Sequence, residues 1–218
     1  MAEREQVSLK AQNFFNDLWA RGDPWELETS NWEHERYSRL IAMLDRPRYG
    51  RLLEIGCGAG TFTRRLAGLA DKVLALDVSS EAIARARAAQ SDLKHVEFRA
   101  GNIMEHNFRD DEPWDLIVIS ETIYFLGWLY SFFDVSWLAS EMFEATLPGG
   151  EILLANTQFE TGEPLLRTSI IRTYRDLFLN VGYELTAETI FPGEKHGVYL
   201  EVLMTLYRKA DPTAGASS

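Results

Sequence analysis

The chain has 218 residues and a mass of 24.9 kDa, a size that suits one globular domain. Hydrophobic residues make up 46% and charged residues 25% of the chain, so wholesale disorder is excluded. The 22 basic and 33 acidic residues give a formal charge of −11. This charge disfavours nucleic acid and anionic lipid as partners, and it favours a neutral or cationic small molecule.

The sequence gives no indication of export, membrane insertion or metal binding. The single cysteine cannot form an intrachain disulfide, and residues 1–15 are charged and lack the apolar run of a secretory signal. Polar residues interrupt the longest apolar stretch, 116–135, so it does not provide the roughly 18 apolar residues of a transmembrane helix. Cysteine, histidine and acidic residues do not occur at metal-ligand spacing. We therefore expect a cytoplasmic protein without a metal.

Two amphipathic helices are predicted ahead of any strand. The first spans 5–20, has Phe15 and Trp19 on its apolar face, and ends before Pro24, which cannot continue a helix. The second starts at residue 31 or 32 and runs to Leu44.

Strands and helices then alternate with short turns between them. The expected strands are 51–55, 72–76, 95–99, 114–119 and 151–155, and the expected helices are 61–69, 80–90 and 135–147. This alternation is typical of a doubly wound, Rossmann-like α/β sheet.

The rhythm changes toward the C-terminus. A helix over 166–180 precedes strands 183–190 and 198–207, and we place a loop around Pro192 and Gly193 between these strands. The last pair is therefore expected to be antiparallel in a seven-stranded, mostly parallel sheet. We expect one domain over 1–208, with residues 1–46 in front of a core at 51–208, and a disordered tail at 209–218.

The most informative segment is a glycine cluster after the first expected strand. Residues 52–60 read Leu-Leu-Glu-Ile-Gly-Cys-Gly-Ala-Gly. Three alternating glycines permit a sharp turn and let a ligand approach the backbone closely. Cys57, between two of these glycines, is expected to contribute its backbone rather than a reactive thiol. Asp77, seventeen residues after Gly60, ends the second expected strand, where a carboxylate can accept hydrogen bonds from ribose hydroxyls. The pattern predicts a nucleoside-cofactor site rather than a mere tight turn.

The spacing of this motif resembles that of class I S-adenosylmethionine-dependent methyltransferases, and the resemblance covers 51–155. It implies that S-adenosyl-L-methionine is the cofactor and S-adenosyl-L-homocysteine the product. It also implies the cofactor-binding residues: Glu54, Gly56, Cys57, Gly58 and Gly60 near the methionyl part, Asp77 and Val78 near the ribose and adenine, Asn102 and Ile103 beside the adenine, and Ser120 facing the methionyl group.

A closer resemblance is to the NodS-like N-methyltransferases, which methylate the free amine of a de-N-acetylated chitooligosaccharide. It rests on segments 23–25, 33–37 and 120–126. By this resemblance the two N-terminal helices form a lid, with Trp25 and Arg36 covering the methionyl end and Arg36 pairing its carboxylate. The alternative for Arg36 is an exposed charge on a helix surface.

Three residues are candidates for the catalytic chemistry. Glu121 follows the fourth expected strand and is a general base, or else an acid that holds the substrate ammonium, begins a helix or binds the cofactor's amino group. Tyr124 is a hydrogen-bond donor to the substrate or a packing residue. His196 is a loop histidine that reaches the site or is only solvated. His34 and His106 are weaker candidates.

The favoured hypothesis is methyl transfer to an amine of a small molecule, with an amino sugar or oligosaccharide as the expected acceptor. A dense aromatic run over 124–137 belongs to the core or a lid, but aromatic walls also stack on sugars and attract cations. The alternatives are an O-methyltransferase acting on a small natural product and a cofactor-binding subunit without turnover.

Overall fold

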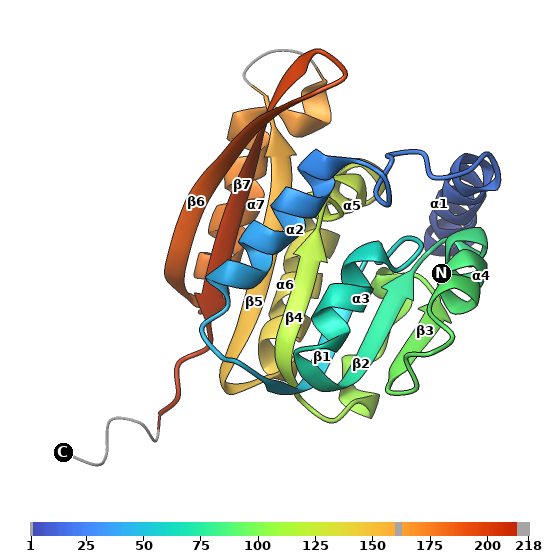
Figure 1. Ribbon diagram of the computed structural model, residues 1–218. Coiled ribbons are helices and arrows are strands. Elements are labelled where there is room, and N and C mark those ends of the chain that lie inside the picture. The colour runs from blue at the N-terminus through green and yellow to red at the C-terminus, as the bar shows by residue number, and fades with distance from the viewer. Residues whose placement is uncertain (1, 160–162, 213–218) are drawn as a thin grey trace. The chain divides into compact units, whose positions relative to one another are not determined.

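The computed structural model describes residues 2–159 and 163–212. Its seven strands form one sheet in the order β3-β2-β1-β4-β5-β7-β6 (Figure 1). The chain divides into two compact units, residues 1–106 and residues 107–218. The expected fold class is confirmed: the sheet is Rossmann-like, with parallel β1–β2, β2–β3 and β4–β5 pairs and antiparallel β5–β7 and β6–β7 pairs.

The first unit begins with two helices and continues with three parallel strands. Its elements are α1 (Ala2–Ala20), α2 (Asn31–Met43), β1 (Tyr49–Ile55), α3 (Thr61–Ala67), β2 (Ala70–Asp77), α4 (Ser80–Ala89), β3 (Val96–Ala100) and the short helix η1 (Ile103–Glu105). β2 pairs with β1 on one side and with β3 on the other, so that Asp77 is the last residue of the middle strand. The N-terminal helices therefore belong to the same compact unit as the glycine loop.

The second unit contains the other four strands. Its elements are η2 (Phe108–Asp110), β4 (Trp114–Ser120), α5 (Ile123–Leu129), α6 (Phe132–Ala145), β5 (Thr146–Gln158), η3 (Pro164–Leu166), α7 (Thr168–Asn180), β6 (Glu184–Lys195) and β7 (Val198–Arg208). Its core includes Leu116, Ile117 and Val118 of β4, all fully buried, as expected for an apolar parallel strand. No helix in the described ranges is long and apolar enough to cross a bilayer.

The loop expected around Pro192 and Gly193 is wrong. Both residues lie in β6, paired with Glu201 and Leu200 of β7. The hairpin turn is instead His196-Gly197, whose φ values of 53° and 74° suit a two-residue turn. Proline is tolerated in β6 because this strand ends the sheet order and needs fewer ladder hydrogen bonds. Figure 1 shows β6 and β7 as one long hairpin.

Two further expectations need correction. Helix α5 was not expected as a separate element, and β5 begins at Thr146 rather than at residue 151. The start of the expected tail is fixed: the Lys209 ammonium donates to the carbonyl oxygens of Phe143 (2.6 Å) and Thr146 (2.9 Å). Residues 213–218 of that tail lie outside the described residues.

A substitution at Gly127 tests the packing of α5 on α7. A Cβ atom at this glycine would lie 1.5 Å from the Tyr174 hydroxyl oxygen. Alanine raises helix propensity by about 1 kcal/mol, but the overlap costs more, so we expect Gly127→Ala to lower the free energy of unfolding by about 1–3 kcal/mol. Urea unfolding measures this. Gly101→Ala is the matched control, because no atom lies within 4 Å of its Cβ position. Equal or greater stability of Gly127→Ala than of the parent would contradict the packing.

Candidate active site

The glycine loop between β1 and α3 is built from left-handed backbone. Gly56, Gly58 and Gly60 have φ values of 79°, 54° and 83°, a region that side chains with a Cβ rarely adopt. The N–H groups of Gly56 and Cys57 both donate to the carbonyl oxygen of Leu76, at 2.8 and 3.0 Å, which ties the loop to the end of β2. The predicted motif is therefore a real turn at the carboxyl ends of adjacent parallel strands, where ligands bind in such sheets.

Asp77 is joined to this loop. One carboxylate oxygen accepts the Gly58 N–H and the other accepts the Ser79 N–H, both at 2.8 Å. Burial raises the pKa of Asp77, and these two N–H groups act in the opposite direction. The predicted ribose-binding acid is thus held at a fixed place beside the loop.

A second acid, Glu54, lies beneath the loop at the end of β1. Its side chain is only 3% exposed, and one carboxyl oxygen accepts the Thr63 hydroxyl at 2.5 Å. Burial raises the pKa of Glu54 to about 8, and the negative charge of Asp77 adds to this increase. A buried acid and a half-buried acid therefore lie close together at this place, an arrangement that a bound cation would stabilise.

The thiol of Cys57 takes no part in such chemistry. It is buried, and burial raises its pKa well above the usual range of a thiol. The residue contributes backbone to the loop, as the sequence predicted.

Helix α1 packs directly on the glycine loop. A Cβ at Gly58 would lie 2.8 Å from a ring carbon of Trp19, so the indole occupies the space that a side chain would need. Trp19 is buried with Ala59 of the loop, and the half-buried Trp25 packs against them, with its ring 5.8 Å from that of Trp19 in an edge-to-face arrangement. Trp25 thus lies next to the loop. That it covers the methionyl end of the cofactor stays a prediction.

Polar contacts also attach α1 to the residues that follow β2 and β3, and Figure 1 shows α1 beside α4. The side-chain oxygen of Asn16 accepts the Ser79 hydroxyl (2.8 Å) and the Glu81 N–H (3.2 Å). The amide of Asn102 donates to the Ser8 hydroxyl (3.0 Å). Residues 78–81 and 102 therefore lie under the first helix.

The expected adenine-side residues occupy a structured turn. The side-chain oxygen of Asn102 accepts the Met104 N–H (3.0 Å) and caps η1, while Ile103 is buried and Val78 half-buried. An apolar side chain next to an amide suits the face and edge of a purine. Their role toward the cofactor stays a prediction.

Arg36 is not an exposed surface charge. Its side chain is about 3% exposed, its Nε donates to Glu33 (2.8 Å), and its guanidinium lies 4.8 Å from the centre of the Tyr37 ring. A buried arginine of this kind is held by specific partners, which excludes the surface alternative. Whether it also pairs a cofactor carboxylate stays a prediction.

In the second unit, Glu121 connects the ends of two strands with α5. Its φ of 55° is left-handed, and its N–H donates to the carbonyl oxygen of Ala155 on β5 (2.8 Å). One carboxylate oxygen accepts the Tyr124 hydroxyl (3.1 Å) and the Thr157 N–H (3.0 Å). Tyr124 is therefore both packed and hydrogen-bonded, and its hydroxyl holds the candidate base.

The remaining two candidates are less distinctive. Ser120 is half-buried, and its carbonyl oxygen accepts the Thr122 hydroxyl (3.0 Å). His196 is exposed at the β6–β7 turn with a left-handed backbone, so the hairpin explains its conformation. A catalytic role for His196 stays a prediction.

Sequence analysis missed two polar residues at the end of β5. Asn156 and Gln158 are almost completely buried, and no atom of the described residues is hydrogen-bonded to their side-chain oxygens. The Gln158 amide nitrogen donates to Glu201 (3.3 Å), which directs its oxygen away from that carboxylate. Buried acceptors without a donor are uncommon and suit a ligand. The sequence signal was the run of three polar residues, Asn-Thr-Gln, directly after the apolar stretch 152–155.

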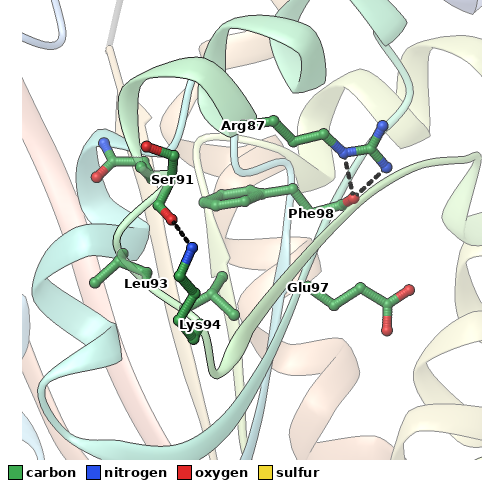
Figure 2. A pocket seen from close by; sticks show the side chains of 8 residues that line it. Arg87, Ser91, Leu93, Lys94, Glu97 and Phe98 are labelled. Atoms are coloured by element: carbon green, nitrogen blue, oxygen red, sulfur yellow. Dashed lines mark hydrogen bonds between the residues drawn. The ribbon is translucent and has the colours of Figure 1, made fainter.

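A separate hollow lies at the other end of β3. It encloses about 360 Å³ and is lined by eight residues between the end of α4 and the start of β3, including Arg87, Lys94 and Phe98 (Figure 2). The guanidinium of Arg87 donates to the Phe98 carbonyl (2.6 Å), and the Lys94 ammonium donates to Ser91 (2.8 Å). These cations are already occupied, and the hollow contains none of the predicted cofactor residues. Across the described ranges, no group of three His, Cys, Asp or Glu side chains is arranged to hold a metal ion.

Comparison with known proteins identifies the family. The model of the Nodulation protein S (NodS) family matches residues 9–131, which is more than half of the chain. The chain belongs to the NodS family. The match includes most of α1, all of α2, the glycine loop, Asp77 and Glu121, and it ends before most of the second unit.

Individual relatives agree with this assignment. Nodulation protein S of Bradyrhizobium diazoefficiens is 37% identical over 105 residues, which are 48% of this chain and 49% of that protein. The protein of the same name from Rhizobium tropici is 28% identical over 140 residues, 64% of this chain and 57% of that one. The NodS-family chain therefore spans about half the length of these relatives.

A solved structure supports the fold over a longer range. The N-methyltransferase NodS from Bradyrhizobium japonicum WM9, crystallised with S-adenosyl-L-homocysteine, matches with a TM-score of 0.76. The match covers 91% of this chain and 98% of that one, at 22% identity. At this identity the likeness shows the fold.

Glu54 makes stability depend on pH. The folded protein keeps the Glu54 proton up to about pH 8, whereas the unfolded chain releases it near pH 4.5. The free energy of unfolding should therefore fall as the pH rises from about 5 to 8, by up to about 1.4 kcal/mol per pH unit.

Urea unfolding across this pH range tests the effect in Glu54→Gln, which should lose most of this dependence. Glu105→Gln, at an exposed position, is the control and should keep it. If the free energy of unfolding changes with pH by the same amount in the parent and in Glu54→Gln, the raised pKa of Glu54 is refuted.

Proposed function

We propose that this protein is an S-adenosylmethionine-dependent methyltransferase that methylates an amine of a small molecule, with an amino sugar or amino-oligosaccharide as acceptor. The observation that carries the proposal is the glycine loop with left-handed Gly56, Gly58 and Gly60, bonded through Gly58 to the carboxylate of Asp77. Membership of the NodS family supports it, as does the N-methyltransferase named in the structural match.

The residues of the first unit suit this cofactor. Asp77 offers carboxylate oxygens for ribose hydroxyls, and the three glycines allow the backbone to approach the ligand. The buried Glu54 and the half-buried Asp77 favour the positive charge of the ligand's ammonium and sulfonium groups. In our proposal the positive charge of Arg36 pairs with the carboxylate of the cofactor, and Trp25 covers the methionyl end. Val78, Asn102 and Ile103 border the adenine.

When bound, the cofactor supplies a methyl group on a sulfonium that is already activated for in-line displacement and leaves as S-adenosyl-L-homocysteine. The protein has to hold the acceptor nitrogen in line and remove one proton from it, so that its lone pair can form the new N–C bond. Glu121 is the proposed proton acceptor, and the Tyr124 hydroxyl and Thr157 N–H fix its carboxylate. The oxygens of Asn156 and Gln158 can accept N–H and O–H groups of the acceptor.

We further propose that the acceptor is a small molecule rather than a nucleic acid, because the formal charge of −11 opposes a phosphate backbone. The free Cys57 thiol is compatible with action in the reducing cytoplasm.

Asp77→Ala tests the cofactor site. Loss of the carboxylate removes the ribose acceptor, and we expect affinity for S-adenosylmethionine to fall by about 1–3 kcal/mol in isothermal titration. Glu105→Ala is the control. Thermal unfolding must accompany the titration, because Asp77 also bonds to Gly58 and Ser79. Absence of binding by the folded parent protein would overturn the proposed function.

Glu121→Gln tests the proton acceptor. Loss of a general base should slow methyl transfer to a glucosamine amine by about 10²–10⁴-fold. Raising the pH above the pKa of the acceptor amine should restore part of the rate, because the free amine no longer needs a base. Tyr124→Phe keeps the ring but removes the bond to Glu121, so a smaller loss is expected. A rate of Glu121→Gln within threefold of the parent would exclude the base role.

A further inference from the structure

The net negative charge of the chain originates in one segment. Residues 110–166 contain eleven Asp and Glu residues and no Lys, Arg or His. The remainder of the chain has 22 acidic and 22 basic residues, so its formal charges cancel. The charge of −11 is therefore a local property of this segment in the second unit rather than a general means of solubility.

The same segment exposes large aromatic side chains. Trp128, Phe132, Phe133 and Trp137 are 51%, 54%, 71% and 56% exposed, and they lie within ten residues of α5 and α6. We call these four residues the aromatic surface. Single exposed apolar residues are ordinary, but four large rings in so short a segment indicate a binding surface.

Acidic side chains continue this surface along α6. Phe133 and Trp137 are four residues apart, so they lie on one side of the helix, and Glu141 and Glu144 follow one and two turns after Trp137. A ligand lying along this side of α6 therefore meets aromatic rings first and carboxylates next.

The charge decides which ligand fits. A second copy of the chain would bring another strongly acidic segment against this one, and nucleic acid or anionic lipid would be repelled in the same way. An ammonium group is attracted both by carboxylates and by the faces of aromatic rings. The apolar face of a sugar ring can also pack on an aromatic ring.

We propose that the aromatic surface binds the body of an amine-bearing oligosaccharide, such as a glucosamine oligomer, while its terminal amine is methylated. The choice of ligand rests on the proposed function. Trp128 follows Tyr124 by one turn of α5, so the surface begins close to the candidate catalytic pair Glu121–Tyr124. Phe132, Phe133 and Trp137 lie beyond residue 131, where the family match ends.

The test compares ligands of equal length on the full chain. Isothermal titration with a glucosamine hexamer, at a pH below the pKa of its amines, should show binding that weakens with added salt, and the N-acetylglucosamine hexamer should bind less tightly. The double variant Phe133→Ala/Trp137→Ala should bind the glucosamine hexamer about tenfold less tightly. Glu141→Gln/Glu144→Gln should weaken binding less and reduce its dependence on salt.

The matched control is Ile170→Ala/Ile190→Ala, which removes exposed apolar side chains outside the segment and should leave hexamer binding unchanged. Methylation assays add a second readout: the Phe133/Trp137 variant should raise KM for the hexamer while methylation of the glucosamine monomer stays as in the parent. Because the titration needs no cofactor, hexamer binding can be established even if methyl transfer fails. If methyl transfer is observed but the hexamer does not bind to the aromatic surface, this inference fails and the proposed function stays intact.

Three results would overturn the inference. One is equal hexamer affinity in the parent and the Phe133/Trp137 variant. Another is equal, salt-independent affinity for both hexamers, since charge would then play no part. The third is self-association of the parent in sedimentation that the Phe133/Trp137 variant abolishes, which would make the aromatic surface a contact between copies.

Discussion

The hydrogen bond from the Gly58 N–H to Asp77 organises the candidate cofactor site. It joins the glycine loop to the end of β2, and the Leu76 carbonyl reinforces this junction. On its other side Gly58 is covered by Trp19, at a distance that leaves no space for a Cβ. Glycine is thus required there for two independent reasons, a left-handed backbone and a packed indole. The first helix is therefore part of the loop's structure, and residues as distant as Ser8 and Asn102 are held in place by it.

Glu121 has the corresponding role in the second unit. Its backbone bonds to β5, and its carboxylate is held by a residue of α5 and by the backbone of Thr157. A side chain that is fixed from two elements retains one orientation, which is what a proton acceptor or an ammonium-binding group requires. The left-handed φ of Glu121 is the local cost of turning the chain there.

Acidic groups determine the electrostatics of both units, but in different ways. In the first unit Glu54 is buried and Asp77 half-buried, and loss of solvation raises the pKa of each, so a cation bound near them would favour their ionised forms. In the second unit, segment 110–166 contains eleven acidic and no basic residues, and it also exposes large aromatic rings. Both arrangements favour a positively charged ligand, the first for a cofactor and the second for an acceptor.

The sequence by itself determined the strand order along the chain, most of the helices, the glycine loop and Asp77, because these depend on local periodicity and on backbone freedom at particular residues. The burial of Arg36 and the exposure of Phe133 were decided by tertiary structure, since each depends on which neighbours cover a helix face. The same holds for the His196-Gly197 turn, where pairing with β7 carried β6 past Pro192, and for Lys209, which binds carbonyl groups more than sixty residues earlier in the chain. Local patterns specify what a segment can form, whereas contacts between distant segments determine where it ends and what it faces.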